Sequence, residues 1–147
     1  MDLLQEKQLW QRVCPGKEAL PRDPAQGLPG LIAAEATDAA AYLQLCRCFK
    51  GNQSAMLRQM YQQAQSNMAC LRGLYTLITG KQPSARGCEP EAGTPAQMLR
   101  RCYGNKMKLL AQYERRLDDR EYGRVYERLA QQTQNHLRFL LEILGSL

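Results

Sequence analysis

The sequence predicts an all-α protein that folds as a four-helix bundle with a short N-terminal helix. Helix-forming residues such as alanine, leucine and glutamine are plentiful, whereas strand-forming residues are scarce: the chain has one Trp and two Phe. The stretch at residues 62–67 (QQAQSN) has a near-copy at residues 131–136 (QQTQNH), and each lies in a long helical pattern. The chain is therefore predicted to contain two copies of one helical hairpin, whose equivalent positions meet in the interior.

The chain is expected to divide into an N-terminal part, residues 1–30, and a bundle, residues 31–147. Residues 2–13 are predicted to form a short amphipathic helix that carries Trp10. A connector rich in proline and glycine follows it. A large aromatic on a short helix has to be buried somewhere, so Trp10 is a candidate contact residue.

Two helices are predicted in the first half of the bundle. The first covers residues 31–50 and ends at Gly51. One face of it repeats at three- and four-residue steps, through Ile32, Glu35, Ala39, Tyr42 and Cys46. The second covers residues 52–79, with Asn52 as its N-cap.

The second half is predicted to contain the other two helices. Thr94, Pro95 and Gln97 form a capping-box signature that starts a helix over residues 95–117. A tight connection at residues 118–120 leads into the last helix, residues 121–144.

The lengths of the connections indicate the topology. The first and third links are short, which predicts two antiparallel hairpins. The middle link has about 14 residues and reaches roughly 46 Å when extended, whereas the second helix is roughly 40 Å long. The link can therefore act as a crossover loop along the whole bundle.

The sequence also indicates a cellular setting. No apolar run approaches the roughly 20 residues needed to cross a bilayer, and the first residues lack the apolar core of a signal peptide. We therefore expect a cytoplasmic protein without a membrane partner, whose six cysteines are thiols. Most are expected to be small buried fillers. Cys88, in a loop, is the candidate for an exposed reactive thiol, and a thiol-based sensor that uses Cys88 or the Cys46/Cys48 region is one hypothesis.

The net charge of +6 raises the question of nucleic-acid binding. Arginines and lysines crowd the second half, but acidic residues are mixed among them, as on a solvated helix face. No DNA-binding motif accompanies them. We therefore expect no nucleic-acid partner.

The chain resembles the ferritin-like superfamily, and within it the small rubrerythrin-type proteins, over residues 31–147. The similar stretches are residues 31–39 (LIAAEATDA), 71–80 (LRGLYTLITG) and 135–142 (NHLRFLLE). The resemblance implies a ferritin-like bundle that holds two irons: one helix of each hairpin supplies a Glu and the other supplies Glu-x-x-His. Carboxylates bridge and neutralise the metals, and imidazoles complete their coordination.

The sequence departs from this implied ligand set at most positions. Glu35 and His136 are the ligands that remain, and they are the candidate residues of a vestigial metal site. The other implied positions carry residues that are not metal ligands of this family: Ala64, Asn67, Lys106 (when Tyr113 is aligned with Tyr42) and Thr133.

The charges argue against a di-iron centre. Two Fe(II) ions would face one carboxylate and an added ammonium, and an uncompensated buried charge costs several kcal/mol. We expect Glu35 and Lys106 to form a buried ion pair, with Asn67, Thr133 and His136 as neighbours. The alternative is that Lys106 points outward and Glu35 bonds only to Tyr113 or a water. His136 is predicted to be a hydrogen-bonded core residue, although a single metal bound by Glu35 and His136 remains an alternative.

Two functions remain. The first is a non-catalytic binding or structural protein that has lost most di-iron ligands, has no cofactor, and associates as a homo-oligomer (a dimer) or with a protein partner. The alternative is a rubrerythrin-like, metal-dependent redox protein for peroxide reduction or iron oxidation, which needs iron or another divalent metal.

Overall fold

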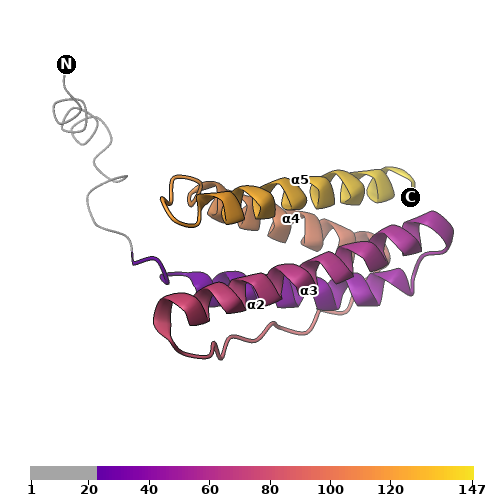
Figure 1. The fold of residues 1–147 in the computed structure, drawn as a ribbon. Helices are drawn as coiled ribbons and strands as arrows, with labels where there is room; N and C mark the ends of the chain where they lie inside the picture. The colour runs from indigo at the N-terminus through magenta and orange to yellow at the C-terminus, as the bar shows by residue number, and fades with distance from the viewer. Residues whose placement is uncertain (1–22) are drawn as a thin grey trace, which may run out of the picture.

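A computed structural model of the chain describes residues 23–147. Within this range it contains four α-helices and no strand: α2 (Leu28–Cys46), α3 (Gly51–Thr79), α4 (Pro95–Glu114) and α5 (Gly123–Gly145). The helices lie side by side as a bundle (Figure 1). The all-α class and the four-helix bundle are thus confirmed, whereas the predicted N-terminal helix and Trp10 lie outside the described residues.

The first helix begins earlier and ends earlier than its periodicity predicts. α2 starts at Leu28, inside the segment assigned to the connector, because Pro29 fits the first turn of a helix. Gly27 precedes it in the left-handed region, with φ 80°. The helix ends at Cys46 instead of at residue 50.

The start of α3 also differs from the prediction. Gly51 does not end the first helix but is the first residue of α3, with φ 65°. Lys50, in an extended conformation, holds the N-cap position, and Asn52 lies inside the helix. The predicted Asn52 cap is therefore wrong, and no side chain caps this end.

The start of α4 follows its sequence signature. The Gln97 amide donates to Thr94 Oγ1 at 3.2 Å, and the Thr94 amide donates to Gln97 Oε1 at 3.0 Å. This capping box satisfies donors that the first helical turn leaves free. At its other end α4 stops at Glu114, so its link to α5 is longer than the predicted tight connection. Asp119 Oδ1 organises that link by accepting from the amides of Glu121 and Tyr122.

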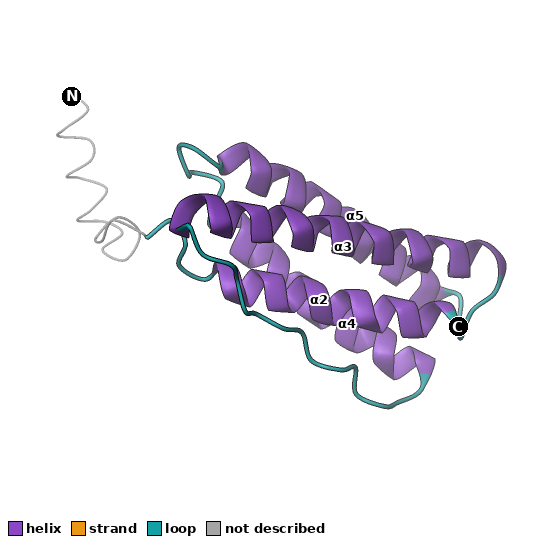
Figure 2. Cartoon of the chain, turned by 60° about the horizontal axis from the view of Figure 1, so that its bottom comes forward, coloured by secondary structure: helices purple, strands orange, loops and turns teal. Residues whose placement is uncertain are grey.

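The segment between α3 and α4 runs along the bundle from one end to the other (Figure 2). It passes against the middle of α2, where the Cys88 amide donates to Thr37 Oγ1 at 2.9 Å. The neighbouring Gly87 has room for no side chain, because a Cβ there would lie 2.6 Å from the Thr37 backbone nitrogen. Arg72 of α3 donates to the Ala85 carbonyl and holds the loop on the other side. The predicted crossing of the bundle is visible in this path.

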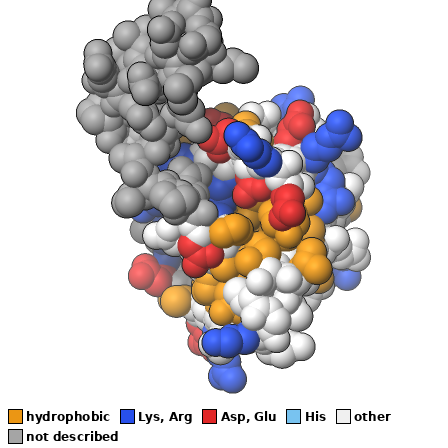
Figure 3. Space-filling model, turned by 60° about the vertical axis from the view of Figure 1, so that its left-hand side comes forward, with side chains coloured by type: hydrophobic (Ala, Val, Ile, Leu, Met, Phe, Trp, Pro, Cys, Tyr) orange, Lys and Arg blue, Asp and Glu red, His pale blue; other side chains and the backbone are white. Residues whose placement is uncertain are grey.

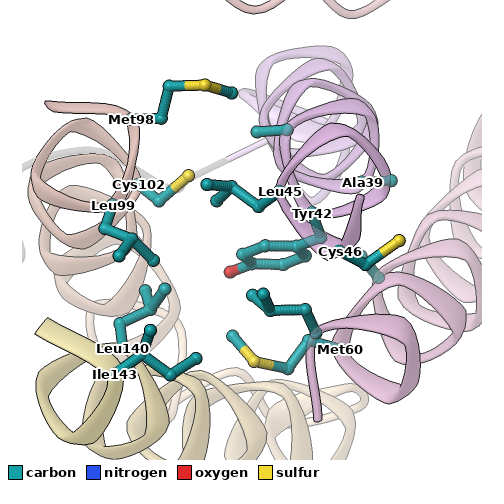
Figure 4. Close-up of a cluster of buried hydrophobic side chains, with 13 residues drawn as sticks. Ala39, Tyr42, Leu45, Cys46, Met60, Met98, Leu99, Cys102, Leu140 and Ile143 are labelled. Carbon is teal, nitrogen blue, oxygen red and sulfur yellow. The ribbon is translucent and has the colours of Figure 1, made fainter. Parts of the chain in front are cut away.

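The apolar core consists of two clusters of buried side chains. The Tyr42 cluster includes Tyr42, Leu45, Leu57, Met60, Leu99, Leu140 and Ile143. The Tyr126 cluster includes Leu28, Leu31, Ile32, Leu71, Leu109, Tyr113, Tyr126 and Leu129. Figure 4 shows the Tyr42 ring reaching into the space that the helices enclose, beside Leu45 and Met60. Ile78 and Val125 are only partly buried and pack against the Tyr126 cluster.

The cysteines correct one expectation. Of the five described, Cys46 and Cys102 are buried, Cys70 is half-buried, and Cys48 and Cys88 are exposed. The expectation that most are buried fillers is therefore wrong within residues 23–147, while the exposure of Cys88 is confirmed. All five are free thiols.

Among the described helices, none combines the length and the apolar character that a membrane span requires.

Candidate functional site

Between the two apolar clusters, all four helices contribute buried polar side chains. On each helix these residues stand between positions of the Tyr42 cluster and positions of the Tyr126 cluster. We call this set the central polar network: Glu35, Asp38, Asn67, Lys106, Thr133 and His136. Four of its members are ionisable groups whose exposed fraction is 0–2%: Glu35, Asp38, Lys106 and His136. Burying such groups is costly unless they pair.

Lys106 supplies the positive charge of the network, and it is shared by two carboxylates. Its Nζ lies 3.2 Å from Asp38 Oδ2 and 3.7 Å from Glu35 Oε2. It also lies 5.7 Å from the centroid of the Tyr42 ring, within reach of a cation–π contact. The expected Glu35–Lys106 pair is thus present, and the alternative of an outward-pointing Lys106 is wrong. The shorter contact, however, is to Asp38.

Glu35 is held by neutral donors as well. The Tyr113 hydroxyl donates to Glu35 Oε1 at 2.6 Å, and Asn67 Nδ2 donates to the same oxygen at 3.5 Å. Burial first, and then the nearby charge of Glu35, raise the pKa of the Tyr113 hydroxyl, so that it remains a donor. These bonds give Glu35 Oε1 two donors.

Asp38 is the less supported of the two carboxylates. Within the described residues, its Oδ2 has the Lys106 ion pair and no hydrogen bond from a neutral donor. Burial raises the pKa of Asp38 to about 6; Lys106 works against this shift, and Glu35 adds to it. With both acids ionised, two buried carboxylates face one ammonium, so the group of three carries one excess negative charge.

His136 belongs to the network but does not contact the ion pairs. Its Nε2 lies 2.7 Å from Gln63 Oε1. Since a carbonyl oxygen only accepts, the ring proton is on Nε2, and Nδ1 is a buried acceptor with no hydrogen-bond partner in residues 23–147. Burial, and then the charge of Lys106, lower the pKa of His136 to about 3. The ring meets the edge of Tyr42 in a T-shaped contact, with centroids 5.6 Å apart.

Two further positions of the implied ligand set, Thr133 and Ala64, carry no metal ligand. Thr133 Oγ1 donates to the Leu129 carbonyl of its own helix at 2.7 Å. Ala64 is fully buried in the Tyr42 cluster. Neither side chain offers a ligand to the centre of the bundle.

The sequence pattern misses two residues of this site, Asp38 and Gln63. Asp38 stands three positions after Glu35, a spacing that places both on one helix face, and this was the available signal. Gln63 lies in the first copy of the near-repeat, and its partner His136 ends the second copy. No single-residue signal distinguishes it from its glutamine neighbours.

The residues present do not fit a pair of metal ions. Within residues 23–147 there is no group of three or more His, Cys, Asp and Glu side chains that could hold a metal. Lys106 stands among the carboxylates and already supplies a positive charge there. Protein-family models, curated proteins and solved structures were compared with this chain, and none matches.

Proposed function

We propose that the chain is a ferritin-like bundle in which a protein cation has replaced the metal ions of an ancestral di-iron centre. We further propose that it works as a non-catalytic binding or structural protein. The observation that carries this proposal is the Lys106 ammonium, fully buried between Glu35 and Asp38. The crossing path of the loop and the placement of Glu35 and His136 on different hairpins agree with the ferritin-like ancestry.

The proposal explains why the network needs no metal. In a di-iron site, carboxylates neutralise the charge of the metals. Here the Lys106 ammonium offsets the carboxylate charge, and Tyr113 and Asn67 satisfy Glu35 Oε1. Removing the cation would leave buried carboxylates unpaired, which is strongly destabilising. The ion pairs would therefore hold α2 and α4 in one arrangement, and the Asn67–Glu35 hydrogen bond would add α3.

Surface features support a binding role. Five large hydrophobic side chains of the described residues are exposed: Leu77, Met107, Leu117, Leu141 and Leu147. Figure 3 shows hydrophobic side chains gathered between charged ones on the side of the bundle that lies at the left of Figure 1. We propose a homodimer or a protein partner at such a surface. Sedimentation equilibrium of the full chain tests the homodimer: a monomer at high micromolar concentration would contradict it.

Metal analysis tests the central part of the proposal. Protein purified from iron-replete cells is expected to contain almost no iron, and anaerobic addition of Fe(II) is expected to leave it metal-free after desalting. A matched variant restores the missing ligands through Ala64→Glu, Asn67→His, Lys106→Glu and Thr133→Glu. This variant is expected to retain iron under the same treatment. About two irons per unmodified chain would overturn the proposal and favour a rubrerythrin-like redox protein.

A single-metal site is the second candidate, and it is favoured by His136 Nδ1, which has no hydrogen-bond partner in residues 23–147. Titration with Co(II), whose absorption reports nitrogen ligation, tests this candidate. Tight binding that is lost in His136→Gln would support it. An unchanged spectrum would leave His136 with a packing role only.

A further inference from the structure

A pocket of about 260 Å³ lies beneath the crossover loop, which is formed by residues 80–94 between α3 and α4. The pocket reaches the central polar network at Asp38. Residues of α2, α4 and the loop line it, and its floor includes Asp38 and Cys102, which are only 2–3% exposed. Its volume falls below the roughly 300–1,000 Å³ of drug-sized sites. The pocket therefore suits a ligand of only a few heavy atoms.

The charges of the lining favour a cation. Three carboxylates line the pocket, from Asp38, Glu89 and Glu91, against one guanidinium, that of Arg101. Arg101 is itself occupied, because it pairs with Glu91 at 3.1 Å and donates to the Ala92 carbonyl. Cys102 adds no negative charge, since burial raises the pKa of its thiol to about 12. The net charge of the ionisable lining is negative.

Asp38 gives an independent reason for a cation at this place. Within the described residues, the Oδ2 oxygen of this nearly buried carboxylate meets the Lys106 ammonium and no neutral donor. The same side chain also lines the pocket. Together, Asp38 and Glu35 exceed the charge of Lys106 by one unit, so a cation in the pocket would balance the network.

The remaining lining defines what kind of cation fits. Apolar surface comes from Ala41, Pro90 and Met98, which suits a short hydrocarbon body. An ammonium group has three donors, and the lining includes the carboxylate of Asp38 and the side chain of Asn105. A bare divalent metal fits less well, because residues 23–147 contain no cluster of three metal-ligating side chains.

We propose that the pocket beneath the crossover loop is a binding site for a small primary alkylammonium ion, held by Asp38 and compensating the excess negative charge of the network. This inference goes beyond the structural role proposed above and does not depend on the ferritin-like ancestry. The loop itself is positioned for this role by the contact of Gly87 with α2 and by the Cys88–Thr37 hydrogen bond.

Calorimetric titration of the full chain at pH 7 with n-butylammonium chloride tests the proposal. We expect saturable binding at one site. n-Butanol, which has a similar shape without the charge, and potassium chloride are expected to show at least tenfold weaker binding. Absence of saturable n-butylammonium binding, or equal binding of n-butanol, would overturn the proposal.

Variants locate the site. Asp38→Asn keeps the Glu35–Lys106 pair and is expected to weaken n-butylammonium binding at least tenfold. Glu142→Gln removes one exposed carboxylate from α5, outside the pocket lining, and is the matched control with unchanged affinity. Unchanged affinity in a folded Asp38→Asn variant would contradict the proposal.

Amide NMR shifts of the unmodified protein locate the binding site without any variant. Saturation with n-butylammonium is expected to move the amides of Thr37, Cys88 and Cys102. Shifts confined to other regions would refute the assignment even if Asp38→Asn fails to fold. Absence of amine binding would leave the metal-free ion-pair network intact, and iron in the purified protein would leave the amine result intact, so the two proposals fail separately.

Discussion

The middle of the bundle and its two ends are stabilised in different ways. The Tyr42 and Tyr126 clusters consist of hydrocarbon and aromatic side chains, whose burial contributes roughly in proportion to area. The central polar network instead depends on charge balance around Lys106. Loss of a methyl group at an end is a local loss, whereas loss of one charge in the middle changes the cost of every other buried charge. The difference shows that one bundle can combine apolar packing at its ends with charge balance at its middle.

The largest effect is expected from removing the central cation. Lys106→Met would leave Glu35 and Asp38 buried without a counter-charge, which should lower the free energy of unfolding by about 3–5 kcal/mol. Urea denaturation followed by circular dichroism measures this change. Lys108→Met, two positions along the same helix at an exposed site, is the control and should change stability by less than about 0.5 kcal/mol. Equal effects of the two variants would mean that the Lys106 charge is unimportant.

The apolar ends are expected to respond additively. Leu57→Ala in the Tyr42 cluster and Leu129→Ala in the Tyr126 cluster should each cost about 2–5 kcal/mol. Because the polar network lies between the clusters, the double variant should cost the sum within about 0.5 kcal/mol. Unfolding of all three variants in guanidinium measures this. A large coupling would show that the two ends are not separate and would weaken the comparison.

The pH dependence of folding stability should distinguish two members of the central polar network, His136 and Asp38. The pKa of His136 falls from 6.5 to about 3 on folding, so the unfolded state binds more protons and stability rises with pH across that window. The pKa of Asp38 rises from 3.8 to about 6, so its contribution acts in the opposite direction and is lost as the pH rises through that range. His136 has the larger shift and should dominate.

Stability measured from pH 4 to pH 7 tests this balance. The contribution of His136 should amount to about 3 kcal/mol. His136→Gln should abolish the rise and leave the opposite, shallower slope of Asp38, which faces Glu35 and Lys106. A profile that the substitution does not change would rule out a neutral buried imidazole as its source.

The smallest effect is expected from Asp38→Asn. The variant removes the excess negative charge but retains the Glu35–Lys106 pair, so stability at pH 7 should change by less than about 1 kcal/mol. Chemical denaturation beside Glu35→Gln, which leaves Tyr113 and Asn67 without an ionised acceptor, gives the comparison. A loss as large as that of Lys106→Met would show that Asp38, and not Glu35, is the principal partner.

The apolar ends were predictable from the sequence because each helix repeats its hydrophobic positions at three- and four-residue steps. Positions such as Leu57, Leu71, Leu129 and Leu140 are buried as that period requires. The meeting of Glu35 with Lys106 was also predictable, since the near-repeat places equivalent residues of two hairpins together. Helix ends were less predictable: Gly51 starts a helix where an isolated glycine favours a stop.

The sequence did not predict that Lys106 pairs with two carboxylates, those of Glu35 and Asp38. The spacing from Glu35 places Asp38 on the same helix face, but only the structure shows that Lys106 of α4 lies nearer to Asp38 than to Glu35. The pocket beneath the loop depends on the path of residues 80–94, which has no periodicity to follow. Its closeness to α2 comes from Gly87, whose missing side chain becomes meaningful only once the two backbones are seen in contact.

The most direct test of the account is a double-mutant cycle on Glu35→Gln and Lys106→Met, measured as free energies of unfolding at pH 7. The account predicts that the double variant is more stable than Lys106→Met alone by at least about 1 kcal/mol, because removing Glu35 relieves one of the two stranded carboxylates. If the two substitutions instead add without coupling, Lys106 does not balance the charge of Glu35, and the proposal that a protein cation stands in for metal is contradicted.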